Sequence, residues 1–225
     1  HELPPKLLAA IKGIAIGSLT ISLLLISFFL SAYDTGFYEK FVQKNLENEK
    51  KIDERVSLHK EIIGFLKGST PNVSSALDAK EKPHMEDVKR IFYWIQVALN
   101  ILLSLGIITA LIVSFMAKKK SREMGAILLA GGIIALLSML LFAAFLWLDF
   151  GSLFDTMHQF LFANGTWVFP MDSTLIQLYP QDFFESIGFL IARSIFFIAN
   201  IFIGAGIYAR FISGGRHDKR NSRIC

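Results

Sequence analysis

Four long apolar runs constrain the fold of this chain more than any other feature. They cover residues 7–32, 91–117, 124–148 and 184–213. Each is about 20 residues or longer, which is the length that a helix needs to cross the hydrocarbon core of a bilayer. A helix also pairs its own backbone polar groups, as a lipid environment requires. The sequence therefore predicts an all-α integral membrane protein, a single membrane domain with four transmembrane helices.

The composition agrees with this interpretation and excludes other classes. Of the 225 residues, 53% are hydrophobic and 19% are charged, and the mean hydropathy is +0.48. Soluble enzymes and disordered proteins are less apolar than this. The chain has one cysteine, Cys225, so a disulfide-rich secreted scaffold is excluded as well.

Basic residues near the ends of the runs predict the orientation of the helices. The loop at residues 118–123 contains four Lys and Arg residues, and short loops rich in such residues face the cytoplasm. Both termini then lie on that side, together with the basic tail at residues 214–225. The cytoplasmic side holds eleven Lys and Arg against three Asp and Glu. We therefore explain the net charge of +4 by the membrane topology, because basic residues on the cytoplasmic side are attracted to anionic lipid. We expect no nucleic-acid partner.

Two segments face outward in this topology. Residues 33–90 place apolar side chains at helical spacing among charges, which predicts amphipathic helices with a break at residues 68–72. Residues 149–183 are too rich in Phe and Trp for a free loop, so we expect them to lie in the outer membrane interface. Within them, residues 172–175 fit the capped start of a short helix.

Polar residues inside the apolar runs are candidates for a functional role. Arg193 lies about nine residues into the fourth run, at a similar expected depth to Gln96 and Asn100 in the second. An arginine within a bilayer usually faces the bundle interior or a wet cavity, so we favour a substrate-facing role for Arg193. The alternative is that its long side chain reaches the lipid headgroups.

Two stretches of the sequence resemble a known family. Their motif residues are His84 and Asp87 before the second run, and Phe154, His158, Phe162, Asn164, Trp167, Pro170, Asp172, Tyr179 and Pro180 in the second outward segment. Together with the four-span layout, they resemble the lipoprotein intramolecular transacylases (Lit) of Gram-positive bacteria. The resemblance implies a membrane acyltransferase that moves the sn-2 acyl chain of a diacylglyceryl lipoprotein to the α-amine of the same N-terminal cysteine. The product is the lyso-form lipoprotein.

The resemblance also implies where the reaction takes place. The protein would lie in the bacterial cell membrane with its active site on the outer side, and its partners would be a diacylated lipoprotein and membrane lipids. The family's functional histidines map onto His84 and His158. We expect His158 to be the general acid and base, and His84, oriented by a hydrogen bond with Asp87, to help stabilise charge. The two roles can be exchanged.

Aminolysis of an ester suits a histidine. An α-amine has a pKa of about 7.7 to 8.0 and is substantially protonated at neutral pH, so a base has to accept its proton. A histidine can return that proton to the leaving glyceryl oxygen, which is typically worth about 10² to 10⁴ in rate. Because amine and ester belong to one molecule and the chain has no GxSxG motif, we expect no acyl-enzyme.

Other residues are candidates for supporting roles. We expect the oxyanion to be stabilised by Arg193, Asn164, a protonated second histidine or backbone amides. Asp155, Trp167 and Asp172 are candidates for binding substrate or for orienting a histidine. The acids fit helix caps and the tryptophan fits an interface anchor equally well. His59 on a charged helix and His217 in the tail are expected to be solvated. No HExxH or similar spacing is present, so we expect no metal and no other cofactor.

Three other functions compete with acyl transfer. A non-catalytic protein that binds lipid or a partner would tolerate substitution of both histidines. A lipid hydrolase would use the same base to activate water, and only its product would differ. A transporter is disfavoured, because the polar residues lie near one side of the membrane and the chain shows no repeat.

The predicted topology can be tested by thiol labelling in a Cys225→Ser background. The Thr70→Cys variant should react with a membrane-impermeant reagent in intact cells, because residue 70 lies in an outward segment. The Lys119→Cys variant should react only after lysis. Labelling of the Lys119→Cys variant from outside, or protection of the Thr70→Cys variant, would contradict the orientation.

Overall fold

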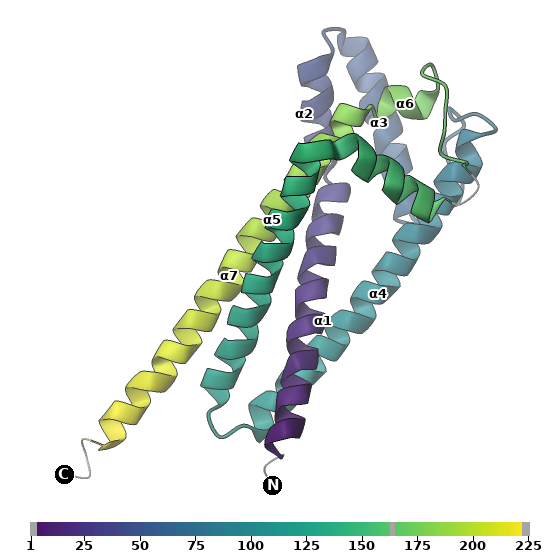
Figure 1. Cartoon of the computed structure of the whole chain (residues 1–225). Coiled ribbons are helices and arrows are strands. Elements are labelled where there is room, and N and C mark those ends of the chain that lie inside the picture. The colour runs from purple at the N-terminus through teal and green to yellow at the C-terminus, as the bar shows by residue number, and fades with distance from the viewer. Residues whose placement is uncertain (1–3, 163–164, 222–225) are drawn as a thin grey trace. The chain divides into compact units, whose positions relative to one another are not determined.

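The structure is a computed structural model that describes residues 4–162 and 165–221, without the side chains of residues 214–221. Its regular structure is helical (Figure 1). Along the chain the helices are α1 (Pro5–Ala32), α2 (Thr35–Asn45), α3 (Glu49–Leu66), α4 (Glu81–Met116), α5 (Lys120–Leu161), α6 (Thr174–Leu178) and α7 (Gln181–Asn221). The all-α prediction is confirmed for these residues.

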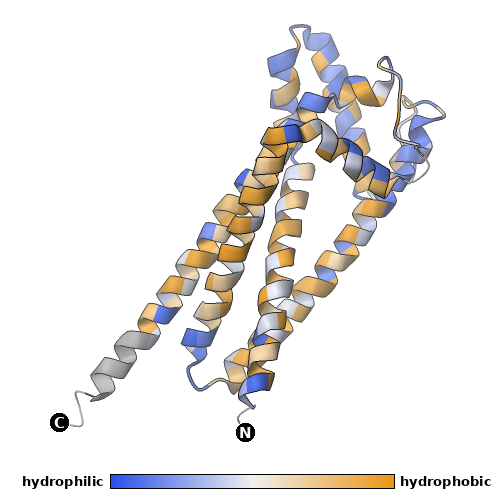
Figure 2. Cartoon of the chain, viewed as in Figure 1, coloured by the Kyte–Doolittle hydropathy of each residue, from blue (hydrophilic) through white to orange (hydrophobic). Residues whose placement is uncertain are grey.

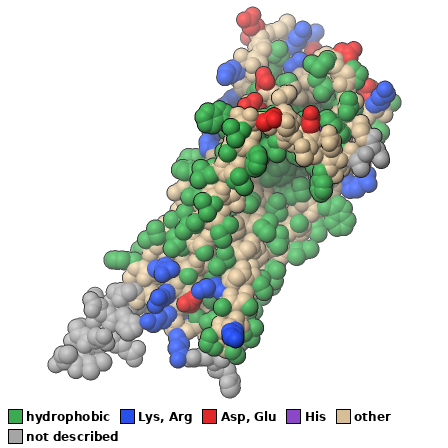
Figure 3. Space-filling view, in the orientation of Figure 1, with side chains coloured by type: hydrophobic (Ala, Val, Ile, Leu, Met, Phe, Trp, Pro, Cys, Tyr) green, Lys and Arg blue, Asp and Glu red, His purple; other side chains and the backbone are tan. Residues whose placement is uncertain are grey.

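Four of the helices are long and apolar enough to cross a bilayer (Figure 2). They are α1, α4, α5 and the Gln181–Ser213 part of α7, in agreement with the four predicted spans. Figure 3 shows hydrophobic side chains over much of their visible surface. Leu137 of α5 and Phe197 of α7, for example, are each 61% exposed. Apolar surface of this extent suits contact with lipid and not with water.

Helices α4 and α5 extend beyond their apolar runs on the side of the second unit. Helix α4 starts at Glu81, and its first ten residues contain six charged side chains. Helix α5 continues past residue 148 to Leu161. Residues 149–161 follow the apolar run and contain Asp149, Asp155 and His158. Because ionisable side chains are costly inside a bilayer, we place residues 81–90 and 149–161 outside the membrane-spanning segments.

A kink separates the apolar part of α5 from its last turns. Asp149 has non-helical backbone angles, with φ −161° and ψ 76°. Its carboxylate accepts a hydrogen bond from the backbone N of Ser152 at 3.0 Å, as a helix N-cap residue does. The kink falls at the predicted boundary between the third run and the second outward segment.

The chain divides into two compact units, and each is described by itself. The first contains His1–Phe28, Val97–Phe142 and Ala192–Cys225, and the second contains Phe29–Gln96 and Ala143–Ile191. The first unit holds most of the apolar runs. The second holds both histidines of the predicted active site.

Close contact between α5 and α7 is a feature of the first unit. A Cβ atom on Gly132 would lie 2.8 Å from the carbonyl oxygen of Ala199, and one on Gly206 would lie 2.7 Å from the backbone N of Leu129. Real Cβ atoms do not come this close to other backbone atoms. Small residues therefore let these two helices approach each other, as is common in membrane proteins.

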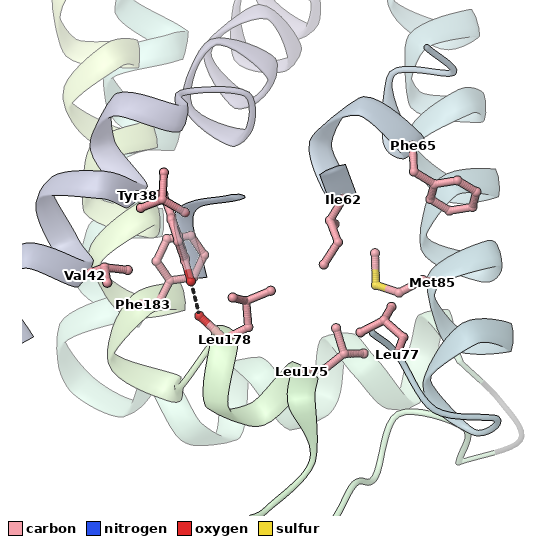
Figure 4. Packing of buried hydrophobic residues seen from close by; sticks show 10 residues of the cluster. Tyr38, Val42, Ile62, Phe65, Leu77, Met85, Leu175, Leu178 and Phe183 are labelled. Carbon is pink, nitrogen blue, oxygen red and sulfur yellow. Dashed lines mark hydrogen bonds between the residues drawn. The ribbon is translucent and has the colours of Figure 1, made fainter. Parts of the chain in front are cut away.

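The second unit has a core built from segments far apart in the sequence (Figure 4). Its buried residues are Tyr38, Val42, Val56, Ile62, Phe65, Leu77, Met85, Leu175, Leu178 and Phe183. Full burial of one Leu, Ile or Phe side chain contributes about 1.5 to 3 kcal/mol. The hydroxyl of Tyr38 also donates a hydrogen bond to the Leu178 carbonyl at 3.0 Å, which ties α2 to α6.

Side-chain caps begin the short helices of this unit. Asp34, Asn48 and Ser173 cap α2, α3 and α6 by accepting hydrogen bonds from backbone N–H groups. Helix α3 ends at Leu66, just before the predicted break. The amphipathic helices predicted within residues 33–90 are therefore confirmed. The short helix predicted to start at residues 172–175 is also confirmed, as α6 with its N-cap at Ser173.

The contact between α5 and α7 predicts opposite effects for two glycines of α7. Gly206→Ala should force the helices apart and lower the free energy of unfolding by about 1 to 3 kcal/mol. Gly204 is the matched control, because a Cβ atom there meets nothing within 4 Å. Gly204→Ala should be neutral or stabilising, since alanine favours helix. Thermal unfolding in detergent measures both, and equal stabilities would contradict the contact.

Candidate active site

His84 lies in the first turn of α4, within the charged extension that precedes the apolar run. Its side chain is only 8% exposed. The imidazole packs against two phenylalanine rings, with centroid distances of 4.6 Å to Phe162 and 5.3 Å to Phe169. Rings from the second outward segment thus shield this histidine from water.

His158 lies on α5 beyond the kink at Asp149 and is also 8% exposed. Its ring centroid lies 3.9 Å from that of Phe154, 5.0 Å from Trp167 and 5.5 Å from Phe162. Nδ1 lies 2.9 Å from the carbonyl oxygen of Phe154. Because a carbonyl oxygen only accepts, Nδ1 carries the proton and Nε2 of the neutral ring bears the lone pair.

Phe162 joins the two histidines into one site. Its ring contacts both imidazoles and is itself buried. The charged form of His158 also acts on the pKa of His84, so the two side chains are within electrostatic reach of each other. The structure therefore brings together His84 and His158, which the sequence places in different outward segments.

The surroundings keep both histidines neutral. The pKa of His84 is lowered to about 4, mainly by burial and also by the charge of His158, against the opposing charge of Asp87. Burial likewise lowers the pKa of His158, against the hydrogen bond to Phe154 and the charge of Asp155. A histidine with a lowered pKa is neutral at pH 7 and can accept a proton. The site therefore offers two neutral imidazoles in an apolar environment.

The predicted hydrogen bond between His84 and Asp87 is wrong. Asp87 Oδ1 instead accepts a hydrogen bond from Arg90 Nη2 at 2.6 Å. Within the described residues, Nδ1 of His84 is buried and has no hydrogen-bond partner. Arg90 lies one turn further along the same face of α4, and a charge-assisted bond is stronger than one to a neutral imidazole. Asp87 acts on His84 only through its negative charge, which opposes the lowering of the His84 pKa.

The remaining candidates fall into two groups. Trp167 and Asp155 accompany the histidines, one by ring contact and the other by charge. Asp172 is exposed beside the start of α6, and Arg193 is exposed on α7 in the first unit. Asn164 lies outside the described residues. In the part of the chain that is described, no group of three or more His, Cys, Asp or Glu side chains is placed to hold a metal ion.

The expectation that His59 is solvated is wrong. Its side chain is 3% exposed and stacks on Tyr38, with 3.9 Å between ring centroids. Nδ1 lies 2.9 Å from the hydroxyl oxygen of Tyr179. The spacing of Val56, His59 and Ile63 places the imidazole on the buried face of α3, which is a signal that the surrounding charges concealed.

Glu81 is a second residue that the sequence did not single out. Its side chain is fully buried, and its two oxygens accept backbone hydrogen bonds from Asp78 and Leu175. Glu81 and His84 are three residues apart, so they lie on the same side of α4. The spacing of Asp78 and Glu81 is that of a capping box, which is the sequence signal that was available.

Comparison with known proteins shows what the chain is similar to. The family described as lipoprotein intramolecular transacylase Lit matches residues 14–184. The solved structure of the membrane integral lipoprotein intramolecular transacylase Lit from Bacillus cereus matches with a TM-score of 0.72 and 19% identity, over 99% of this chain and 100% of that chain.

Two variants of that Bacillus cereus protein, with one histidine replaced by arginine or by alanine, have also been solved. They match with TM-scores of 0.69 and 0.67, each at 18% identity. The matches cover 97% and 98% of this chain, and 95% and 97% of those chains. No curated protein matches the chain.

Acid should destabilise the second unit through His59. Burial, and to a lesser extent the charge of Lys60, lowers the pKa of His59 from 6.5 to about 4. Between these pH values the unfolded chain binds a proton that the folded chain does not. The free energy of unfolding therefore falls as the pH falls, by up to about 1.4 kcal/mol per pH unit.

Thermal unfolding in detergent between about pH 7 and pH 4.5 measures this loss. It should be smaller for His59→Phe, because phenylalanine can keep the ring stack and does not titrate. Equal losses in the two proteins would show that His59 does not carry the effect.

Proposed function

Because the chain belongs to the Lit family of lipoprotein intramolecular transacylases, we propose that His84 and His158 form the active site of its acyl transfer. The chain is a multi-pass integral membrane acyltransferase that acts on lipoproteins. The observation that carries the proposal is the meeting of two buried imidazoles at the ring of Phe162. Family membership sets aside a non-catalytic binding protein and a transporter.

The proposed substrate is a diacylglyceryl lipoprotein with a free N-terminal cysteine. Its α-amine nitrogen attacks the carbonyl carbon of the sn-2 ester, so that a C–N bond forms and the C–O bond to glycerol breaks. The nitrogen loses one proton and the glyceryl oxygen gains one. No protein atom is acylated, and the lyso-form product has the same mass as the substrate.

His158 is positioned to move that proton. Its Nδ1 donates to the Phe154 carbonyl, so Nε2 is the basic atom. The attacking nitrogen becomes acidic as the C–N bond forms, so a base with a lowered pKa can take its proton. The imidazolium that results is stabilised by the Phe154 carbonyl until it returns the proton to the glyceryl oxygen.

His84 is positioned to stabilise the negative charge on the ester carbonyl oxygen. Its Nδ1 is buried and unpaired among the described residues. Buried polar atoms seldom lack a partner, and one beside a candidate base indicates that the substrate supplies the missing group. With the proton on Nδ1, the ring donates a hydrogen bond to the carbonyl oxygen and to the oxyanion that forms from it.

The aromatic surroundings favour transfer over hydrolysis. Rings from Phe154, Phe162, Phe169 and Trp167 cover the two imidazoles and limit the access of water. Amine and ester belong to one molecule, so holding them together can contribute several kcal/mol without a second reactant. A lipid hydrolase, the enzymatic rival, would need a water molecule at the same base and would release fatty acid.

We further propose that residues 33–90 and 149–183 face the outside of a bacterial cell membrane. In the first unit, Lys12 of α1 and Glu123 of α5 form an ion pair at 2.8 Å, which agrees with their predicted location on one side. Phe160 is 86% exposed. An exposed aromatic side chain in the second outward segment suits the lipid interface.

Substitution of either histidine should slow the reaction strongly. The purified protein is incubated with a synthetic diacylglyceryl lipopeptide in detergent, and the N-terminal peptide is mapped by tandem mass spectrometry. We expect the unchanged protein to move one acyl group from glycerol to the α-amine with no change in total mass. His158→Ala and His84→Ala should slow this step about 10² to 10⁴-fold, because each removes an imidazole that handles proton or charge.

His59→Phe is the matched control, because it removes a buried imidazole outside the proposed site. It should keep its activity at neutral pH, and thermal unfolding should show that all three variants are folded. Full transfer by folded His158→Ala or His84→Ala would contradict the proposal. A product lighter by one acyl group would identify a hydrolase.

A further inference from the structure

We propose that Glu81 is a positioning residue that holds the aromatic wall of the active site, formed by Trp167 and Phe169, against the two histidines. The inference rests on the proposed function of His84 and His158. It goes further because it identifies what keeps that site closed.

The carboxylate of Glu81 is buried in an unusual way. It is 0% exposed, Oε1 accepts a hydrogen bond from the backbone N of Leu175 at 2.7 Å, and Oε2 accepts one from Asp78 N at 2.9 Å. Neither ion pair found among the described residues involves it. Burial of a carboxylate is a costly way to stabilise a fold, so its benefit should lie in the geometry that it imposes.

One oxygen of Glu81 fixes the start of α4. Asp78 Oδ1 accepts hydrogen bonds from the backbone N of Lys80 at 2.7 Å and of Glu81 at 2.8 Å, while Glu81 Oε2 accepts from Asp78 N. This reciprocal arrangement is a capping box. It defines the first turn of α4, which is the turn that carries His84.

The other oxygen reaches α6. Leu175 is the second residue of α6, and its N–H is one of those that the start of a helix leaves unpaired. Ser173 accepts the next one, from Ile176 N, at 3.4 Å. Glu81 therefore caps a second helix from outside it and ties α6 to α4.

The segment at residues 165–173 leads into α6 and carries the aromatic wall. Phe169 contacts His84 and Trp167 contacts His158. Because Glu81 holds the end of this segment, loss of its hydrogen bond to α6 would let both rings move away from the imidazoles. Water would then reach the site, and the positions of both histidines relative to the substrate would be less well defined.

Three variants separate the two hydrogen bonds of Glu81. Glu81→Ala removes both. Glu81→Gln keeps an oxygen that can accept from Leu175 N, although its amide group cannot accept from Asp78 N. Asp78→Ala removes the cap of α4 and leaves the hydrogen bond to α6. We expect kcat to fall at least about tenfold in Glu81→Ala, much less in Glu81→Gln, and little in Asp78→Ala, which should mainly lower the melting temperature.

Tryptophan fluorescence reports the wall directly. The chain has three tryptophans, so Trp94→Phe and Trp147→Phe leave Trp167 as the only one. Quenching of Trp167 by acrylamide should increase in Glu81→Ala and stay unchanged in Asp78→Ala. A folded Glu81→Ala variant with unchanged quenching or with unchanged kcat would overturn the inference.

The same data distinguish this inference from the active-site proposal. If the histidine variants are inactive and folded Glu81→Ala is fully active, Glu81 has no positioning role and the active-site proposal stands. If the histidine variants are active, the active-site proposal fails. Quenching of Trp167 in Glu81→Ala then decides alone, because an increase supports the role of Glu81 in holding the wall and no change refutes it.

Discussion

The removal of two imidazoles from water is the physical step on which this account depends. Aromatic rings from residues 154–162 and 165–173 cover His84 and His158, and this burial lowers the pKa of both. A solvated histidine would be partly protonated near neutral pH, whereas these two rings are neutral there and have a free lone pair. The same rings limit water and offer an apolar surface to acyl chains. The ring contacts therefore support two parts of the proposal: a neutral histidine as the base, and acyl transfer in preference to hydrolysis.

The membrane explains why these groups lie on long helices. In lipid, the backbone N–H and C=O groups must form their hydrogen bonds within the chain. The apolar runs of α4 and α5 are therefore continuous helices. Each helix continues past its run, and His84 and His158 lie on those extensions. Helices hold side chains more rigidly than loops do, which suits a reaction that depends on alignment within one substrate molecule. The kink at Asp149 gives the extension of α5 its own direction.

The length of the apolar runs and the spacing of apolar residues predict structure that depends on neighbouring residues. This structure includes the four spans, the amphipathic helices α2 and α3, and the capped α6. These patterns do not predict which distant segments meet. The burial of His59 depends on its contact with Tyr179, and the role of Glu81 depends on Leu175, which no spacing in the sequence relates to it. The spacing of His84 and Asp87 predicted a hydrogen bond between them, but Asp87 pairs with the charged Arg90 instead. The proposed active-site histidines, His84 and His158, were identified by the family resemblance, because residue chemistry alone did not establish a role for either.

Titration of the histidine side chains in the folded protein would show whether burial keeps both imidazoles neutral. Protein labelled with ¹⁵N-histidine is followed by NMR in detergent from about pH 8 to pH 4.5, and signals are assigned by single substitutions. We expect His84 to stay neutral until about pH 4, and His158 to titrate below its ordinary 6.5 with the proton of its neutral form on Nδ1. Titration of both rings at 6.5 or above would contradict the account.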